Sequence, residues 1–124
     1  MARPPLTGPG QQRLQVLEDA MAQMGLIHSI VERMALAFRN QQPLQPFGQQ
    51  LRRAAPPIAD LLKGQYGTIA DQLTQLTLVA TRGGGERAKI TALREGVAGV
   101  KAAIEIAQRK VFEQFAVEEK ETGE

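Results

Sequence analysis

The chain has 124 residues, which is enough for one hydrophobic core but too short for two. It has no cysteine, no tryptophan and a single histidine, so disulfides, thiolate metal sites and most sets of catalytic side chains are excluded. Its formal net charge of +2 hides an uneven distribution of charge along the sequence.

The last seven residues are strongly acidic. They hold four acids and one lysine, and subtracting these from the totals of 13 acidic and 15 basic residues leaves 9 acidic and 14 basic residues. The rest of the chain therefore has a net charge of about +5, which attracts phosphate backbones or acidic protein faces. The alternative is that solvated arginines only keep a small helical protein in solution.

The first ten residues contain three prolines and two glycines, a composition that predicts a disordered arm. They lack the apolar segment of a signal peptide, and no run in the chain approaches the length of a membrane span. We therefore expect a cytoplasmic protein with a disordered arm over residues 1–10, a helical domain over 11–118 and an acidic frayed tail over 119–124.

The first helix is predicted from about Gln11 to Arg39, because apolar residues recur there every three or four positions. At 1.5 Å per residue this helix would be a rod of roughly 45 Å. Polar residues and two prolines in segment 40–46 end it. The predicted apolar stripe comprises Leu14, Leu17, Met21, Met24, His28, Val31, Ala35 and Phe38, widened by Val16, Ala20, Ile27, Ile30 and Met34.

The middle of the chain allows two interpretations. A nearly unbroken helical period from Phe47 to Ala80 would suit one long helix, kinked or restarted at the adjacent prolines Pro56 and Pro57. The Lys63-Gly64 pair, however, is typical of a helix end.

A second helix start is indicated after Gly67, where Thr68 and Asp71 have the spacing of a capping box. We therefore prefer two helices, over residues 47–63 and 68–81. With a final helix these make an all-α, antiparallel up-and-down bundle of four helices.

The final helix is predicted from Glu86 to Glu118, with an acid at the positive end of its dipole. The glycines at 83–85 that precede it are a flexible connection, since no strand and no Gly-Lys-Ser/Thr surround them as in a nucleotide loop. Its apolar stripe is regular throughout: Ile90, Leu93, Val97, Val100, Ile104, Ala107 and Val111.

Beside that stripe runs a row of small residues, which we call the small-residue row. A helix with a bulky stripe next to a small one can pack on two partners at once. We expect the row to form an interface between copies of the chain, or else a close contact within one subunit. Its members are Ala92, Gly96, Gly99 and Ala103.

The single histidine, His28, lies on the predicted apolar stripe, with Glu32 one helical turn later. The pair suggests a metal site or a pH switch. A di-iron bundle, however, needs repeated carboxylate–histidine pairs from several helices, and there is no second histidine. We therefore expect a packed core or interface histidine and no metal.

Cations recur every seven residues along one flank of the final helix, at Arg87, Arg94 and Lys101, about 10.5 Å apart. Such a strip can follow phosphates, although the sequence offers no aromatic platform for stacking bases. A solvated face with weak ion pairs to Glu86 or Glu105 is the alternative. If the helices pack antiparallel, further cations are expected to extend the strip: Arg52, Arg53, Lys63 and Arg82.

The segment from Phe47 to Gly67, FGQQLRRAAPPIADLLKGQYG, resembles the second helix of the 23S-rRNA intervening-sequence proteins, a family of small bacterial bundles. In that helix an Arg-Arg-Ala-Ala-like start leads to an Ile-containing turn and a closing glycine. Residues 92–109 are similar to the family's later helix, where small residues precede an aliphatic run. The matching residues of the first segment are Gln50, Arg52, Arg53, Ala54, Ala55, Ile58 and Gly64.

The same superfamily includes the accessory variability proteins of diversity-generating retroelements. Those proteins are basic four-helix bundles that assemble into pentameric barrels and bind nucleic acid and a reverse transcriptase. The resemblance therefore implies a bundle that self-associates and has these partners. This chain departs from the pattern in two respects, since Pro56 and Pro57 fall inside the matching helix and its body is less basic.

No acid–base pair, activated nucleophile or metal set can be assembled from the sequence, so we expect no enzymatic activity and no cofactor. The leading hypothesis is a self-associating bundle whose basic flank binds nucleic acid or a nucleic-acid enzyme such as a reverse transcriptase. The alternative is a protein–protein adaptor or scaffold that meets other proteins through the small-residue row and the acidic tail.

Overall fold

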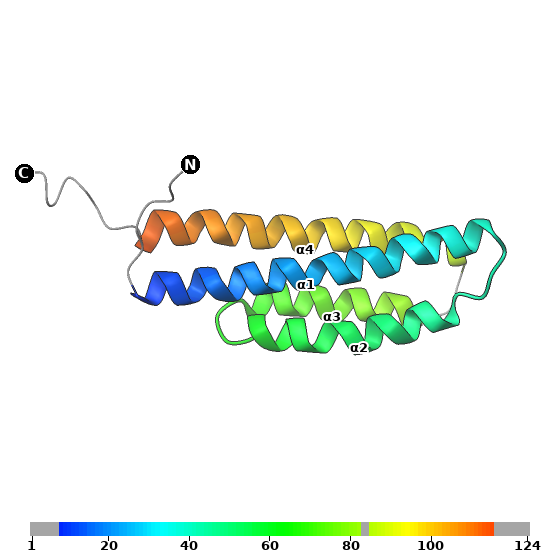
Figure 1. Cartoon of the computed structure of the whole chain (residues 1–124), viewed down its shortest axis with the longest axis horizontal. Helices are drawn as coiled ribbons and strands as arrows, with labels where there is room; N and C mark the ends of the chain where they lie inside the picture. The colour runs from blue at the N-terminus through cyan, green and yellow to red at the C-terminus, as the bar shows by residue number, and fades with distance from the viewer. Residues whose placement is uncertain (1–7, 83–84, 116–124) are drawn as a thin grey trace, which may run out of the picture.

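The computed structural model describes residues 8–82 and 85–115 and confirms the all-α bundle (Figure 1). The described residues form four helices and no strand. Residues 1–7 and 116–124, which include most of the expected arm and all of the expected acidic tail, lie outside the described residues, whereas residues 8–10 of the expected arm are helical rather than disordered. The helices are α1 (Gly8–Arg39), α2 (Gln45–Leu62), α3 (Gly67–Thr81) and α4 (Glu86–Phe115).

The four helices alternate in direction along the bundle, so each is antiparallel to the next in the chain (Figure 1). Contacts join α1 to α2, α2 to α3, α3 to α4 and α4 to α1, whereas the diagonal pairs do not meet in the described part of the chain. The helices differ in length: α1 and α4 have 32 and 30 residues, and α2 and α3 have 18 and 15. The first turns of α1 and the last turns of α4 therefore extend beyond the α2–α3 turn.

The ends of α1 show two local features. It begins at Gly8, three residues before the expected start, because Pro9 has the φ that the first turn of a helix requires. Beyond Arg39, Gln41 adopts a positive φ of 57°, and Gln42 N–H donates to the carbonyl of Ala37 at 2.8 Å. This is a Schellman end, in which the left-handed position usually belongs to glycine.

The middle of the chain forms two helices, as preferred above, and the single kinked helix is wrong. α2 nevertheless runs through Pro56 and Pro57 without a break, with both prolines exposed to solvent. The capping box is wrong as well, because α3 begins at Gly67 with Tyr66 as its N-cap and no side-chain cap. Thr68 is already inside the first turn, so its hydroxyl cannot occupy the capping position.

The core agrees closely with the α4 stripe and less closely with the α1 stripe. All seven predicted α4 residues are buried. On α1, Met21 and Phe38 are only half-buried and His28 is exposed, while Ala20, Ile27 and others predicted to widen the stripe are fully inside. The buried face of α1 is broader than one stripe, with eleven buried residues against seven on α4, and its centre lies beside the predicted stripe.

Candidate functional site

The three cations predicted on one flank of α4 lie along the surface where α4 meets α1. Arg87 and Arg94 line a hollow of ≈ 380 Å³ together with Arg39 of α1. Arg94 and Lys101 line the next hollow, of ≈ 270 Å³, together with His28. Because Arg94 belongs to both hollows, they form one continuous surface, which we call the α1–α4 face.

The floor of the α1–α4 face is apolar and its edges are charged. Val31, Ala35, Ile90 and Val97 lie at the bottom of the two hollows and belong to the core. Among the residues that line the hollows, the only carboxylate is Glu32. The charged residues of this face are Arg39, Arg87, Arg94, Lys101 and Glu32.

Glu32 is held by Arg94 across the α1–α4 contact. Two guanidinium nitrogens of Arg94, Nε and a terminal nitrogen, donate to the two carboxylate oxygens of Glu32, each at 2.8 Å. The side chains are 50% and 42% exposed, so the pair is solvated and contributes little to stability. Its geometry is the two-pronged one with which arginine also binds phosphate.

The pKa of Glu32 is lowered from its ordinary value, mainly by the hydrogen bonds from Arg94. The charges of Arg94, His28 and Arg39 act in the same direction, and partial burial opposes them. Glu32 therefore stays ionised at neutral pH and offsets part of the positive charge of this face.

His28 is not the packed core residue that its position in the predicted stripe suggested. Its side chain is exposed at the edge of α1 that faces α4, where it lines a hollow beside Lys101. The inward stripe passes instead through Met24, Ile27 and Val31. Over residues 8–82 and 85–115, no cluster of three or more side chains of the metal-binding types occurs.

The cations expected to extend the α4 strip are placed elsewhere. Arg52 lines a separate cavity, between α2 and α4, with Lys89. Arg53, which follows Arg52 on α2, is exposed. Lys63 and Arg82 follow the C-terminal ends of α2 and α3. The α2–α3 turn and the start of α4 are at opposite ends of the bundle, so antiparallel packing places Lys63 far from Arg82 and Arg87, and none of the four expected cations lines the two hollows.

The small-residue row is divided between two environments. A Cβ at Gly96 would lie 3.0 Å from Cδ1 of Leu76, so this glycine permits a close contact with α3 of the same chain. Ala103 packs against the core, whereas Ala92 and Gly99 are exposed. At Gly96, therefore, the row forms a contact within one subunit.

Sequence reasoning missed the contribution of α1 to this face. In the sequence, Arg39 stands at the predicted end of a helix and Glu32 one turn after His28, and neither position indicates a link to the α4 strip. These three residues are four and seven positions apart, which places them on one side of α1. Aligning this side of α1 with the α4 strip in antiparallel register would have predicted the α1–α4 face from the sequence.

Within the described ranges, none of the four helices combines the length and the apolar character that crossing a membrane requires. Comparison with known proteins gave no match to a family model, to a curated protein or to a solved structure. The resemblance to the intervening-sequence and retroelement accessory proteins therefore stays a prediction.

Proposed function

We propose that this protein is a non-enzymatic helical bundle that binds nucleic acid through phosphate contacts on its α1–α4 face. The observation that supports this proposal is the charge of that face, where four cations surround one carboxylate. Two helices supply these cations, so the positive charge forms a surface rather than a single line. A surface of this kind attracts a polyanion and holds it by releasing counterions.

The residue types of the α1–α4 face favour contacts with the phosphate backbone of a nucleic acid over contacts with its bases. Arginine and lysine side chains bind phosphate oxygens, and these contacts fix position without reading sequence. Two aromatic side chains line the hollows: Phe38, which is half-buried against the core, and the exposed imidazole of His28. Stacking on a ring accepts any base, so we propose binding with little sequence preference.

The decisive experiment removes the positive charge from this face. Changing Arg87, Arg94 and Lys101 together to Gln should weaken RNA or DNA binding steeply at low salt. Each lost phosphate contact should lower the slope of log affinity against log salt by roughly 0.7 to 0.9. The measurement is a binding titration at several salt concentrations, with circular dichroism to confirm that the helices persist.

A matched control removes three cations that lie off the face, by changing Arg53, Lys63 and Arg82 to Gln. It changes the net charge equally, so we expect a much smaller loss of affinity. Equal losses in the two triple variants would show that only the overall charge matters and would overturn the proposed site. No binding of the wild type to any nucleic acid near 50 mM salt would overturn the proposed function.

If the wild type binds no nucleic acid, a protein–protein adaptor is the better proposal for its function. One observation favours it: four large apolar side chains are about half exposed on α1, α3 and α4. Such residues supply the apolar contacts of protein interfaces, although scattered ones are ordinary on a protein surface. They are Leu26, Leu36, Leu78 and Ile106.

We further propose, from the resemblance of residues 47–67 and 92–109, that copies of the chain associate and that a reverse transcriptase or a similar enzyme is a partner. A pull-down with a reverse transcriptase, compared between the wild type and the triple variant of the α1–α4 face, tests the partner. Binding that survives in the variant would show that a different surface contacts the enzyme.

A further inference from the structure

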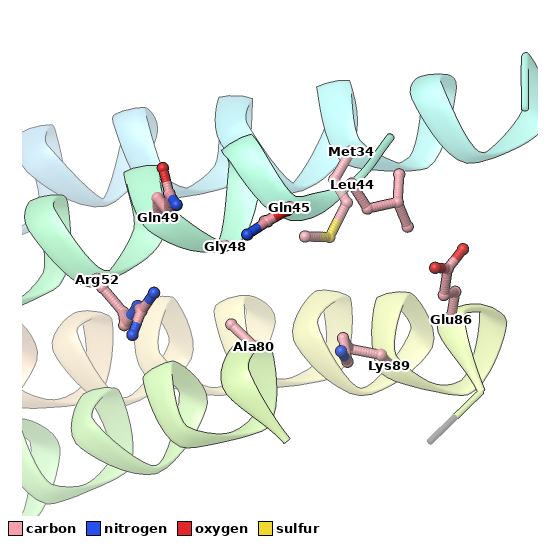
Figure 2. Close-up of a pocket in the computed structure, with 9 residues that line it drawn as sticks. All are labelled: Met34, Leu44, Gln45, Gly48, Gln49, Arg52, Ala80, Glu86 and Lys89. Atoms are coloured by element: carbon pink, nitrogen blue, oxygen red, sulfur yellow. The ribbon is translucent and has the colours of Figure 1, made fainter. Parts of the chain in front are cut away.

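The end of the bundle where α2 and α4 begin contains a cavity of ≈ 350 Å³, which we call the end cavity (Figure 2). Its position follows from the lengths of the helices. α3 is the shortest of the four, and near its end at Thr81 the small Ala80 leaves space between the first turns of α2 and α4. Met34 lines the space from the side of α1.

The inner wall of the end cavity is apolar. The Met34 side chain is 2% exposed and Ala80 is 7% exposed, and Leu44 is packed against the same core. Gly48 contributes no side chain, and a Cβ there would lie 3.6 Å from the carbonyl oxygen of Ala80, at ordinary contact distance. A larger side chain at this position would therefore fill space that is now empty.

The rim of the end cavity is polar and carries a net positive charge. α2 contributes Gln45, Gln49 and Arg52, and α4 contributes Glu86 and Lys89. In the part of the chain that the structure describes, the side chains of these five residues make no hydrogen bond or ion pair with protein groups. Their donors are therefore available to a ligand.

The charges are arranged along the cavity rather than mixed. In Figure 2, Arg52 lies at one end and Glu86 at the other, with Lys89 between them. An anionic group would be attracted to the end near Arg52 and Lys89 and repelled from the end near Glu86. The apolar wall at Met34 and Leu44 then faces the rest of the ligand.

We propose that the end cavity binds a small amphipathic anion, with a carboxylate or phosphate head on a short hydrocarbon chain. The head contacts Arg52 and Lys89, and the chain packs on Met34 and Leu44. The volume is at the lower end of the range for small-molecule sites and equals that of about a dozen water molecules in the liquid. A chain of roughly eight carbons is therefore the right size.

This proposal is independent of nucleic-acid binding, because none of the residues that line the end cavity belongs to the α1–α4 face. The probes are octanoate, octyl phosphate and octan-1-ol, added to the full ¹⁵N-labelled chain, the two anions below their micelle concentrations and the alcohol below its solubility limit. Octanoate or octyl phosphate should produce saturable shifts in the amide signals of residues 45–52 and 86–89. Octan-1-ol should bind at least tenfold more weakly, because it lacks the charge.

Two substitutions test the two halves of the cavity. Gly48→Leu should fill the space and reduce the affinity for octanoate at least tenfold. Gly25→Leu is its matched control, since a Cβ at Gly25 meets nothing within 4 Å and the residue is exposed elsewhere on α1. Arg52→Gln should weaken octanoate about tenfold while leaving octan-1-ol unchanged, because only the charged contact is lost.

Each result supports or overturns the proposal. The preferred anion identifies the head group: tighter binding of octyl phosphate favours a phosphate ester, and tighter binding of octanoate favours a carboxylic acid. The proposed site would be overturned if neither anion, at concentrations on the order of 10 mM, produced saturable shifts in the amide signals. Equal affinity in the wild type and in Arg52→Gln would also overturn it, and this variant changes only an exposed side chain of a folded helix.

Discussion

At the scale of single residues, Glu32 determines how much of the α1–α4 face is available. Its carboxylate occupies the guanidinium of Arg94 in the arrangement that a phosphate would adopt. A nucleic acid bound to this face must displace Glu32 or share Arg94 with it. Arg87 and Lys101 have no such competitor in the described residues, so they are the easier phosphate ligands.

We therefore expect Glu32→Gln to bind nucleic acid more tightly than the wild type, by about threefold to tenfold at low salt. The substitution removes the competing carboxylate and frees Arg94. The control is Asp60→Asn, which makes the same change in charge on the exposed surface of α2. A titration at fixed salt compares the three proteins, and equal affinity of the two variants would remove Arg94 from the binding site.

Glu32→Gln should also change how the stability of the protein depends on pH. The folded-state pKa of Glu32 lies below its ordinary value of 4.5, so the stability that it contributes is present above that value. It is lost as the pH falls through the lower, folded-state pKa. Between pH 6 and pH 3 the melting temperature of the wild type should fall slightly more than that of Glu32→Gln, and the difference should be small because the pair is exposed.

At the scale of the helices, sequence periodicity was sufficient for α4 and insufficient for α1. A helix that contacts its neighbours with one narrow stripe reveals that stripe directly, as Ile90 to Val111 do. α1 buries a wider face, and residues at the edge of such a face, such as His28, look the same in sequence as residues at its centre. Which edge a side chain occupies depends on the positions of α2 and α4.

The candidate site shows the same limit. The heptad spacing predicted that Arg87, Arg94 and Lys101 share one side of α4. Arg39 and Glu32 enter the site only through the register between α1 and α4, which pairs Glu32 with Arg94, 62 positions further along the chain. The end cavity was not predictable at all. It depends on where α3 ends relative to its neighbours, and helix ends are the least certain feature of a sequence pattern.

The end of α1 provides a prediction at this scale. Gln41 has a positive φ, which costs a residue with a Cβ more than it costs glycine. We expect Gln41→Gly to stabilise the protein by roughly 0.5–1 kcal/mol, as a rise of a few degrees in the melting temperature. Gln42→Gly is the control, since that residue lacks a positive φ, and it should be neutral or destabilising. The reverse order would contradict the left-handed conformation.

At the scale of the whole molecule, the small-residue row connects packing to assembly. Gly96→Leu should destabilise the single chain by about 1–3 kcal/mol, because the new side chain would overlap Leu76. Gly99→Leu should leave the chain stable, because a Cβ there meets nothing within 4 Å. If exposed Gly99 contacts a second copy, the same substitution should separate the copies.

Light scattering coupled to size exclusion, together with thermal melts, distinguishes the two effects. The self-association hypothesis expects an oligomer for the wild type at tens of micromolar and a smaller species for Gly99→Leu. A wild type that is monomeric at that concentration would show the hypothesis to be wrong. An oligomer that persists in Gly99→Leu would instead place the interface on another surface.

The unequal helix lengths also set a gradient of local stability along the bundle. Where all four helices overlap, each backbone segment is covered by two neighbours, so its amide hydrogens exchange with solvent only when the whole domain opens. Near Gly8 and Phe115, α1 and α4 extend past the α2–α3 turn and are covered mainly by each other. Those turns open first. Arg94 and Lys101 lie well inside α4, away from both of its ends, so a polyanion bound there would meet a surface that keeps its shape while the free ends of the same two helices fray.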